Sequence, residues 1–187
     1  MKSAARKGKM LVISGPSGSG KTTICKRLLE DPRVRFSVSA TTRQPRPGEV
    51  DGRDYHFVTR DEFKQWMAEG AFIEHADVYG NMYGTLRRPM EEALARGEVY
   101  LLEIDVQGAL QLKTLGEPGL YVFIAPPDFD ELRRRLVARK TEAPAVLERR
   151  LQKAEDEWRE RTKYDFIVVN DVVERAVGEV RRIAGLD

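Results

Sequence analysis

The sequence predicts an α/β fold, a three-layer core in which helices cover both faces of a parallel sheet. Short, nearly continuous apolar runs alternate with helical patterns, which is typical of parallel strands buried on both sides. The first apolar run, residues 10–14, leads into Gly-Pro-Ser-Gly-Ser-Gly-Lys-Thr at residues 15–22. This segment has the spacing of a phosphate-binding P-loop, Gly-x-x-x-x-Gly-Lys-Ser/Thr. A P-loop belongs between a buried strand and a helix, so the two observations support each other.

The predicted elements of the core follow this alternation in order. A helical pattern at residues 23–30 comes directly after the P-loop, so the loop lies at the start of a helix. Three further apolar runs predict strands, and a helical pattern follows each of them. The predicted strands are residues 99–105, 120–125 and 165–170, and the predicted helices are residues 107–114, 128–138 and 172–183.

Two regions interrupt the alternation and are predicted to be attachments to the core. Residues 36–85 are polar and rich in turns, which predicts a small mixed or antiparallel insertion. Its strand candidates are residues 36–41, 55–58 and 72–77, and its helix candidate is residues 61–69. Residues 133–150 are dense in arginine and interrupted by Pro144, which favours a helical hairpin.

Composition narrows the classes of function. The chain has 187 residues, 41% hydrophobic and 33% charged, which suits one soluble core with small insertions. Its net charge of +2 favours binding neither to nucleic acid nor to a membrane. The single cysteine, Cys25, cannot form an internal disulfide, and the apolar stretch that follows the basic residues at the start is only the short first predicted strand, so this is not a secretory signal. We therefore expect a cytoplasmic protein, whose oligomeric state the sequence leaves open.

The P-loop predicts binding of a nucleoside triphosphate. Its glycines let several backbone N–H groups face one phosphate, and the following helix directs its positive dipole end to the same point. Lys21 supplies a positive charge for the outer phosphates, and the Thr22 hydroxyl can bind Mg²⁺. An accidental match in a Gly/Ser-rich linker is the alternative, but the flanking strand and helix argue against it.

Two arginines in the first attachment predict a second phosphate site. Arg43 and Arg46 flank a turn rich in proline and glycine, and a guanidinium offers a planar set of donors to phosphate oxygens. Tyr55 and Tyr83 belong to the same attachment. A solvated basic loop is the alternative, but beside a P-loop the pattern favours a phosphorylated acceptor.

Three carboxylates stand in or beside apolar runs. Glu74 interrupts an apolar stretch, and Asp105 ends a predicted strand, where ligands bind in open α/β sheets. A carboxylate can accept two hydrogen bonds from guanine, whereas adenine offers the wrong pattern on that edge. Pairing of Glu74 with an arginine and capping of a helix by Asp105 remain alternatives. Glu103 precedes Asp105 by two residues on the same strand face and is a candidate to position Mg²⁺ through water.

The arginines of the second attachment predict contacts with polyphosphate. Arg135 and Arg139 are four residues apart and share one helix face, and Arg149 and Arg150 follow. Cations around a migrating phosphoryl group favour its transfer. The alternative is a solvated helical face. Its balancing carboxylates would be Glu142, Glu148, Glu155 and Glu157.

Several blocks of the sequence together resemble the guanylate kinase family. They occur in the family's order and extend from residue 10 to about residue 183, so the resemblance is more specific than a P-loop alone. The blocks are ISGPSGSGKTT at 13–23, SVSATTRQPRPGE at 37–49, GRDYHF at 52–57, GNMYGT at 80–85, LEIDVQG at 102–108, FIAPP at 123–127 and VVND at 168–171.

The resemblance implies a Mg²⁺-dependent ATP:GMP phosphotransferase of purine nucleotide metabolism, with dGMP as a further expected acceptor. Its parts would be a P-loop core at residues 1–36, 86–130 and 156–187, a GMP-binding region at 37–85 and a lid at 131–155. Closure of the lid over both nucleotides would exclude water. These parts agree with the core and the two attachments described above.

The resemblance also implies a role for individual residues. ATP would be bound by Gly15, Pro16, Ser17, Gly18, Ser19, Gly20, Lys21, Thr22 and Thr23, with Asn170 at the adenine. The GMP phosphate would be held by Arg43, Arg46, Tyr55 and Tyr83, with Glu49 supporting the arginines. Guanine would be read by Ser39, Glu74, Thr85 and Asp105. The catalytic residues would be Lys21, Arg43, Arg135, Arg139 and Arg150, and the metal site would use Thr22 and, through water, Glu103.

This sequence departs from the family pattern at a few positions, and we expect these departures to affect the turnover rate rather than the type of reaction. Glu103 stands where aspartate is common, and Lys140 follows the lid arginine where glycine is common. Two rival functions differ in kind from each other. The first is a kinase for another nucleotide or a phosphorylated sugar, against which Glu74 and Asp105 argue. The second is a protein-interaction module without catalysis, against which Lys21 and the lid arginines argue.

Overall fold

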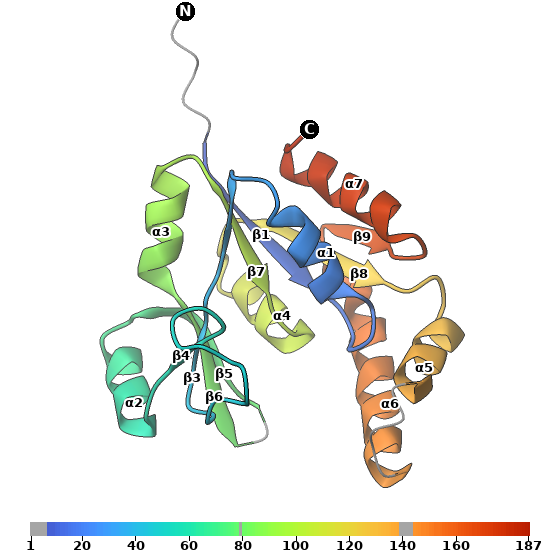
Figure 1. Cartoon of the computed structure of the whole chain (residues 1–187), viewed down its shortest axis with the longest axis horizontal. Coiled ribbons are helices and arrows are strands. Elements are labelled where there is room, and N and C mark those ends of the chain that lie inside the picture. The colour runs from blue at the N-terminus through green and yellow to red at the C-terminus, as the bar shows by residue number, and fades with distance from the viewer. Residues whose placement is uncertain (1–6, 79, 139–143) are drawn as a thin grey trace, which may run out of the picture.

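A parallel sheet forms the centre of the molecule. The computed structural model describes residues 7–78, 80–138 and 144–187. The strands of this sheet are β1 (Lys9–Ser14), β2 (Val34–Phe36), β7 (Val99–Glu103), β8 (Leu120–Ala125) and β9 (Phe166–Val169). They lie in the order β2-β7-β1-β8-β9 and all pair in parallel, so their carboxyl ends meet at one edge (Figure 1). The predicted fold class is confirmed.

Helices cover both faces of this sheet because side chains alternate along each strand. Leu11 and Ile13 of β1 pack with α1 and α7 on one face, whereas Met10 and Val12 pack with α3 and α4 on the other. These helices are α1 (Lys21–Leu28), α3 (Arg87–Ala95), α4 (Val106–Thr114) and α7 (Val173–Ala184). The sheet is therefore packed between two apolar layers, one on each face, and this packing fixes the edge at which the P-loop lies. No helix in the described ranges is long and apolar enough to cross a membrane.

A second sheet, of four strands, forms the first attachment. Its strands are β3 (Ala40–Thr41), β4 (His56–Phe57), β5 (Phe72–Val78) and β6 (Asn81–Leu86), in the order β4-β3-β6-β5. β3 and β4 are parallel and the other pairs antiparallel, so the predicted mixed insertion is present. Helix α2 (Arg60–Ala68) packs on it through Phe63, whose ring stacks on Phe72 with centroids 4.5 Å apart. Thr59 and Glu62 form a reciprocal capping box that begins α2.

Two helices form the second attachment. Helix α5 (Phe129–Ala138) packs against α6 (Pro144–Arg159) through Leu132, Leu136 and Ala154. Pro144 is the first residue of α6, a position at which proline costs no intrahelical hydrogen bond. A short 3₁₀ helix, η1 (Glu160–Lys163), then leads into β9. In Figure 1 the small sheet and the α5–α6 pair extend from the same edge of the main sheet, on opposite sides of the P-loop. The domain boundaries given above stay predictions.

The predicted strand at residues 36–41 is wrong. The chain ends β2 at Phe36, which pairs with Leu101 of the main sheet, and begins β3 at Ala40, which pairs with Gly84 of the small sheet. Between them the Ser37 N–H donates to the Leu101 carbonyl. One alternating run therefore serves two sheets, and the division depends on which distant strand each residue meets.

The sequence pattern did not reveal β6 and α3. Gly84 weakens the strand pattern of β6, yet a Cβ at this position would lie 2.7 Å from a ring carbon of Phe72. Pro89 similarly obscures α3, although it lies in the first turn, where proline is tolerated. In both elements a residue that usually interrupts regular structure is accommodated by its surroundings.

Candidate functional site

The P-loop connects β1 to α1 at the carboxyl edge of the main sheet. Gly15, Gly18 and Gly20 have φ angles of 138°, 89° and 92°, values that side chains other than glycine rarely allow. A Cβ on Gly15 would lie 2.4 Å from the Ile124 carbonyl oxygen, so the loop packs directly on the end of β8. Gly20 is the N-cap of α1, and the loop therefore leads its backbone into a helix N-terminus.

Lys21 is held over this loop. Its ammonium donates hydrogen bonds to the carbonyl oxygens of Gly15, at 2.6 Å, and Pro16, at 3.0 Å. Burial lowers the pKa of Lys21, while the nearby carboxylates of Glu103 and Glu157 act in the opposite direction. A buried cation gains more from a phosphate anion than an exposed lysine would, because water screens the two charges less.

Thr22 and Glu103 form an oxygen site beside the loop. The Thr22 hydroxyl donates to a carboxylate oxygen of Glu103 at 2.6 Å, and Glu103 ends β7, the strand next to β1. Hydroxyl and carboxylate oxygens suit Mg²⁺, which also keeps several waters and phosphate oxygens as ligands. The donor set therefore fits the predicted metal.

On the other side of the cleft, Arg43 is oriented by Glu49. Its Nη2 donates to both carboxylate oxygens of Glu49, at 2.9 and 3.0 Å, and its guanidinium lies 5.5 Å from the Tyr55 ring centroid. The hydrogen bond from Arg43 lowers the pKa of Glu49. Glu49 also accepts the backbone N–H of Arg46 at 2.7 Å, and the rings of Tyr55 and Tyr83 meet edge to face at 5.9 Å. The structure thus brings the predicted phosphate-binding residues together, with the Arg46 side chain exposed.

The predicted guanine-reading carboxylates lie close to each other. Glu74 is 7% exposed and accepts the Thr85 hydroxyl at 2.6 Å, so its partner is Thr85 rather than an arginine. Asp105 accepts the Gly108 N–H at 2.9 Å and caps α4, the structural role left open above. A Cβ on Gly108 would lie 3.3 Å from Glu74 Oε2 and 3.5 Å from Asp105 Oδ1. Burial, and then the charge of Asp105, raise the pKa of Glu74.

The lid arginines contact the core at two points. Arg150 of α6 donates to the Ser17 hydroxyl of the P-loop at 3.0 Å. Arg135 of α5 donates to Glu131 at 2.8 Å and to the Asn170 carbonyl at 3.2 Å. The predicted catalytic residue Arg139, and with it Lys140, lies outside the described residues.

One cleft of about 700 Å³ separates these groups. The predicted residues that line it are Gly15, Ser17, Lys21, Thr22, Ser39, Glu49, Tyr55, Glu103, Asp105 and Arg150. P-loop, small sheet and lid therefore face a common space. Asn170 is 4% exposed and lies behind the P-loop instead, donating its side-chain amide to the Ser19 carbonyl at 2.8 Å.

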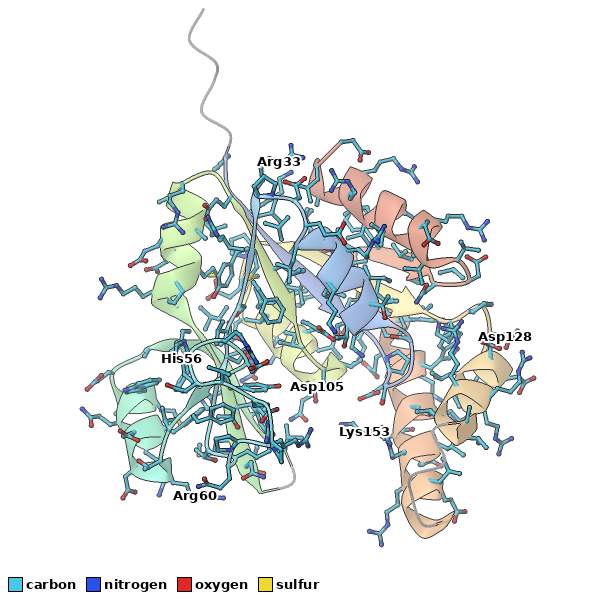
Figure 2. All side chains as sticks on the ribbon, in the orientation of Figure 1. Arg33, His56, Arg60, Asp105, Asp128 and Lys153 are labelled. Carbon is cyan, nitrogen blue, oxygen red and sulfur yellow. The ribbon has the colours of Figure 1, made fainter. Side chains whose placement is uncertain are left out.

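The cleft also contains charged residues that sequence reasoning did not assign. Lys153 of α6 lies 3.8 Å from Asp105 and 3.6 Å from Glu157, and Figure 2 labels Lys153 beside α6 and Asp105 at the start of α4. The Glu157 side chain is only 13% exposed, and burial raises its pKa, so it does not belong to a solvated face. Arg150, Lys153 and Glu157 follow i, i+3, i+7 spacing on one helix, a signal that could have revealed them once Arg150 was assigned.

Fold and site together define a class. A P-loop on a parallel sheet faces a partly buried arginine–tyrosine cluster across one cleft, with cationic side chains of a helical pair at its rim. This arrangement is that of a P-loop kinase that brings two phosphorylated ligands together.

Comparison with known proteins identifies the family within this class. The family model described as guanylate kinase matches residues 7–185. A guanylate kinase of Geobacter metallireducens is 49% identical over 95% of this chain and 88% of its own length, and one of Clostridium perfringens is 51% identical over 95% and 82%. The crystal structure of guanylate kinase from Anaplasma phagocytophilum aligns with a TM-score of 0.77 at 36% identity, covering 97% of this chain and 86% of that one. The chain belongs to the guanylate kinase family.

Proposed function

We propose that this protein transfers the γ-phosphoryl group of ATP to GMP, giving ADP and GDP. The observation that carries the proposal is that the P-loop lysine and Asp105, which lies beside Glu74, line the same cleft. A phosphorylated sugar offers no pair of guanine donors, so these two carboxylates favour a guanine nucleotide as the acceptor. dGMP is expected to serve as well, because no predicted contact requires the 2′-hydroxyl.

The donor nucleotide would lie along the P-loop. Backbone N–H groups of Gly15–Thr22 and the N-terminus of α1 would bind its β- and γ-phosphates, and Lys21 would exchange its carbonyl partners for phosphate oxygens. Mg²⁺, held by Thr22 and through water by Glu103, would neutralise charge on the same phosphates. Arg150 already lies at the loop and would add a further cation.

The acceptor would lie across the cleft. Arg43, fixed by Glu49, would bind the GMP phosphate together with Arg46 and the hydroxyls of Tyr55 and Tyr83. Ser39, Glu74, Thr85 and Asp105 would bind the base. Glu74 must be ionised to accept two hydrogen bonds from guanine. Burial raises its pKa, and the hydrogen bond from the Thr85 hydroxyl opposes that rise by stabilising the ionised form.

The chemistry needs no covalent enzyme intermediate. An oxygen of the GMP phosphate attacks the γ-phosphorus in line, the bond from phosphorus to the β,γ-bridging oxygen breaks, and ADP leaves. The protein orients the two nucleotides and offsets their mutual repulsion with Lys21, Arg43, Arg135, Arg139 and Arg150. Closure of the lid would keep water from the γ-phosphate. Small-angle scattering should show compaction with an ATP analogue plus GMP, and an unchanged radius would contradict closure.

The direct test is ADP formation with ATP and Mg²⁺ against GMP, dGMP, AMP, CMP, UMP and a ribose bisphosphate. Turnover confined to GMP and dGMP is expected. Turnover with another acceptor would retain a P-loop kinase but overturn the roles of the two carboxylates. Nucleotide binding without any turnover would favour the non-catalytic interaction module. Both expected substrates are nucleotides of the cytoplasm, which is where we infer that the protein acts.

A further inference from the structure

Asn170 is fixed between the P-loop and the lid. It follows β9, and its backbone N–H donates to the Ala125 carbonyl at the end of β8, at 2.7 Å. Its side-chain Nδ2 donates to the Ser19 carbonyl at 2.8 Å, and its own carbonyl accepts from Arg135 of α5 at 3.2 Å. The residue is 4% exposed, so these partners hold it in one orientation.

The bond to Ser19 determines where a neighbouring N–H points. In a planar trans peptide the C=O and the N–H are antiparallel. Because the Ser19 carbonyl points toward Asn170, the Gly20 N–H of the same peptide points away from Asn170. Gly20 is the N-cap of α1, and as a glycine it has no side chain that could fix this peptide plane. The Asn170 amide is therefore the group that holds this plane.

Asn170 also packs closely against Gly20. A Cβ on Gly20 would lie 2.2 Å from Asn170 Nδ2, so the amide presses directly on the backbone that it orients. Asn170 and Ser19 are 151 positions apart in the chain, and β9 is separated from β1 by β8 in the sheet. The strand that follows the lid thus supports the loop that precedes the first helix.

We propose that Asn170 is a positioning residue that aims the Gly20 N–H at the phosphates of the donor nucleotide, independently of the nucleotide base. The inference rests on the proposed ATP site but differs from an adenine contact in what it predicts. A contact with adenine concerns the base alone. Support of the loop concerns every ligand that carries a polyphosphate, including one without a base.

The test compares three ligands with Mg²⁺, namely ATP, ITP and inorganic tripolyphosphate, by calorimetry on the full chain. We expect Asn170→Ala to weaken all three by a similar factor, about tenfold, because one oriented donor to a charged phosphate is lost. Asn170→Ser keeps a polar side chain that is too short to reach Ser19, so it should weaken binding as Asn170→Ala does. If the alanine variant does not fold, the serine variant is used for the same measurement. A loss confined to ATP would overturn the proposal in favour of an adenine contact.

Tyr164→Phe is the matched control. Tyr164 precedes β9 and donates a buried hydrogen bond to the Ser14 hydroxyl at 3.0 Å, outside the loop itself. The Tyr164→Phe variant should bind tripolyphosphate with an affinity within about twofold of wild type. The affinity for GMP should be unchanged in every variant. Equal losses in Tyr164→Phe and Asn170→Ala would show a general loss of stability and overturn the proposal. A wild-type protein that binds tripolyphosphate but does not phosphorylate GMP would overturn the proposed function alone.

Discussion

The two sides of the cleft are built in different ways. The donor side is built mainly from one continuous segment, Gly15–Thr22, in which backbone N–H groups would bind the phosphates, and Glu103 and Arg150 add to it from elsewhere. The acceptor side collects side chains from distant positions, from Ser39 to Asp105, on both sheets. Its charged groups are held by partners such as Glu49 for Arg43 and Thr85 for Glu74.

This difference separates affinity from specificity. Backbone donors recognise any polyphosphate, so the donor side depends on backbone shape and on Lys21. Buried side chains with a fixed donor–acceptor pattern can reject a wrong base, so the acceptor side depends on the identity of single residues. Substitutions on the donor side should therefore mainly lower kcat, and substitutions on the acceptor side should mainly raise the KM for GMP.

The largest effect is expected on the donor side, from Lys21→Met. Loss of the buried cation should lower kcat by about 10²–10³-fold, because its charge acts on the migrating phosphoryl group. Steady-state ADP formation measures the effect, and calorimetry with GMP provides the control. Weakened GMP binding in this variant would mean that the two sides are not independent.

On the acceptor side, Glu74→Gln should raise the KM for GMP about 10- to 100-fold and leave ATP affinity unchanged.

The Glu74→Gln variant should also be more stable than the wild type at pH 7. The pKa of Glu74 is raised in the folded state, so folding holds its proton more tightly and stability falls as pH rises from the ordinary value of 4.5 through the raised one. Melting temperatures should show this gain at pH 7 and its disappearance below about pH 4. A loss of stability at pH 7 would contradict the burial argument.

Arg43→Lys should have a smaller effect on the same side. Lysine keeps the charge but cannot donate to both Glu49 oxygens and to the Gln44 carbonyl, as Arg43 does. GMP affinity should fall about tenfold, while guanosine, which has no phosphate, should bind as in wild type. Equal losses of affinity for GMP and for guanosine would show that Arg43 does not bind the GMP phosphate.

Outside the cleft, Asp31→Asn should lower the stability of the protein and leave its affinities for ATP and for GMP unchanged. The Asp31 side chain is 6% exposed and joins Arg33, at 2.7 Å, to Arg181 of α7, at 3.1 Å. These arginines lower its pKa, so the stabilisation is present at neutral pH and lost as pH falls below the ordinary value of 3.8. We expect a loss of about 2 kcal/mol in the free energy of unfolding at pH 7.

The control for this variant is Asp171→Asn, which breaks an exposed pair with Arg175 and should cost less than about 0.5 kcal/mol. Chemical denaturation at pH 7 and pH 3 measures both variants. Equal losses at the two pH values would show that the Asp31 effect is not electrostatic.

Much of the fold was predictable because its signals are local. Strand β8 has the predicted bounds, and α1, α4, α5 and α7 begin and end within two residues of the predicted ranges. Buried parallel strands are nearly continuous apolar runs, and amphipathic helices repeat their apolar residues within a few positions. The errors lie where two sheets compete for one stretch, at residues 36–41, and where Gly84 and Pro89 obscured β6 and α3.

The candidate site divides in the same way. The P-loop was readable residue by residue, and the family blocks indicated the acceptor residues. Lys153 and Glu157 were not assigned, because a charged helix face has the same pattern whether it faces solvent or a cleft. Only the packing of α6 beside Asp105 distinguishes the two.

By itself the sequence determined the P-loop, the parallel sheet and the family, since each depends on residue types at short spacing. The tertiary structure alone decided that β2 and β3 belong to different sheets, that Glu74 approaches Asp105, and that Asn170 supports Ser19. Those contacts join segments that lie between about 30 and 151 positions apart in the chain. Their geometry depends on how the layers pack, which no local pattern of residues encodes.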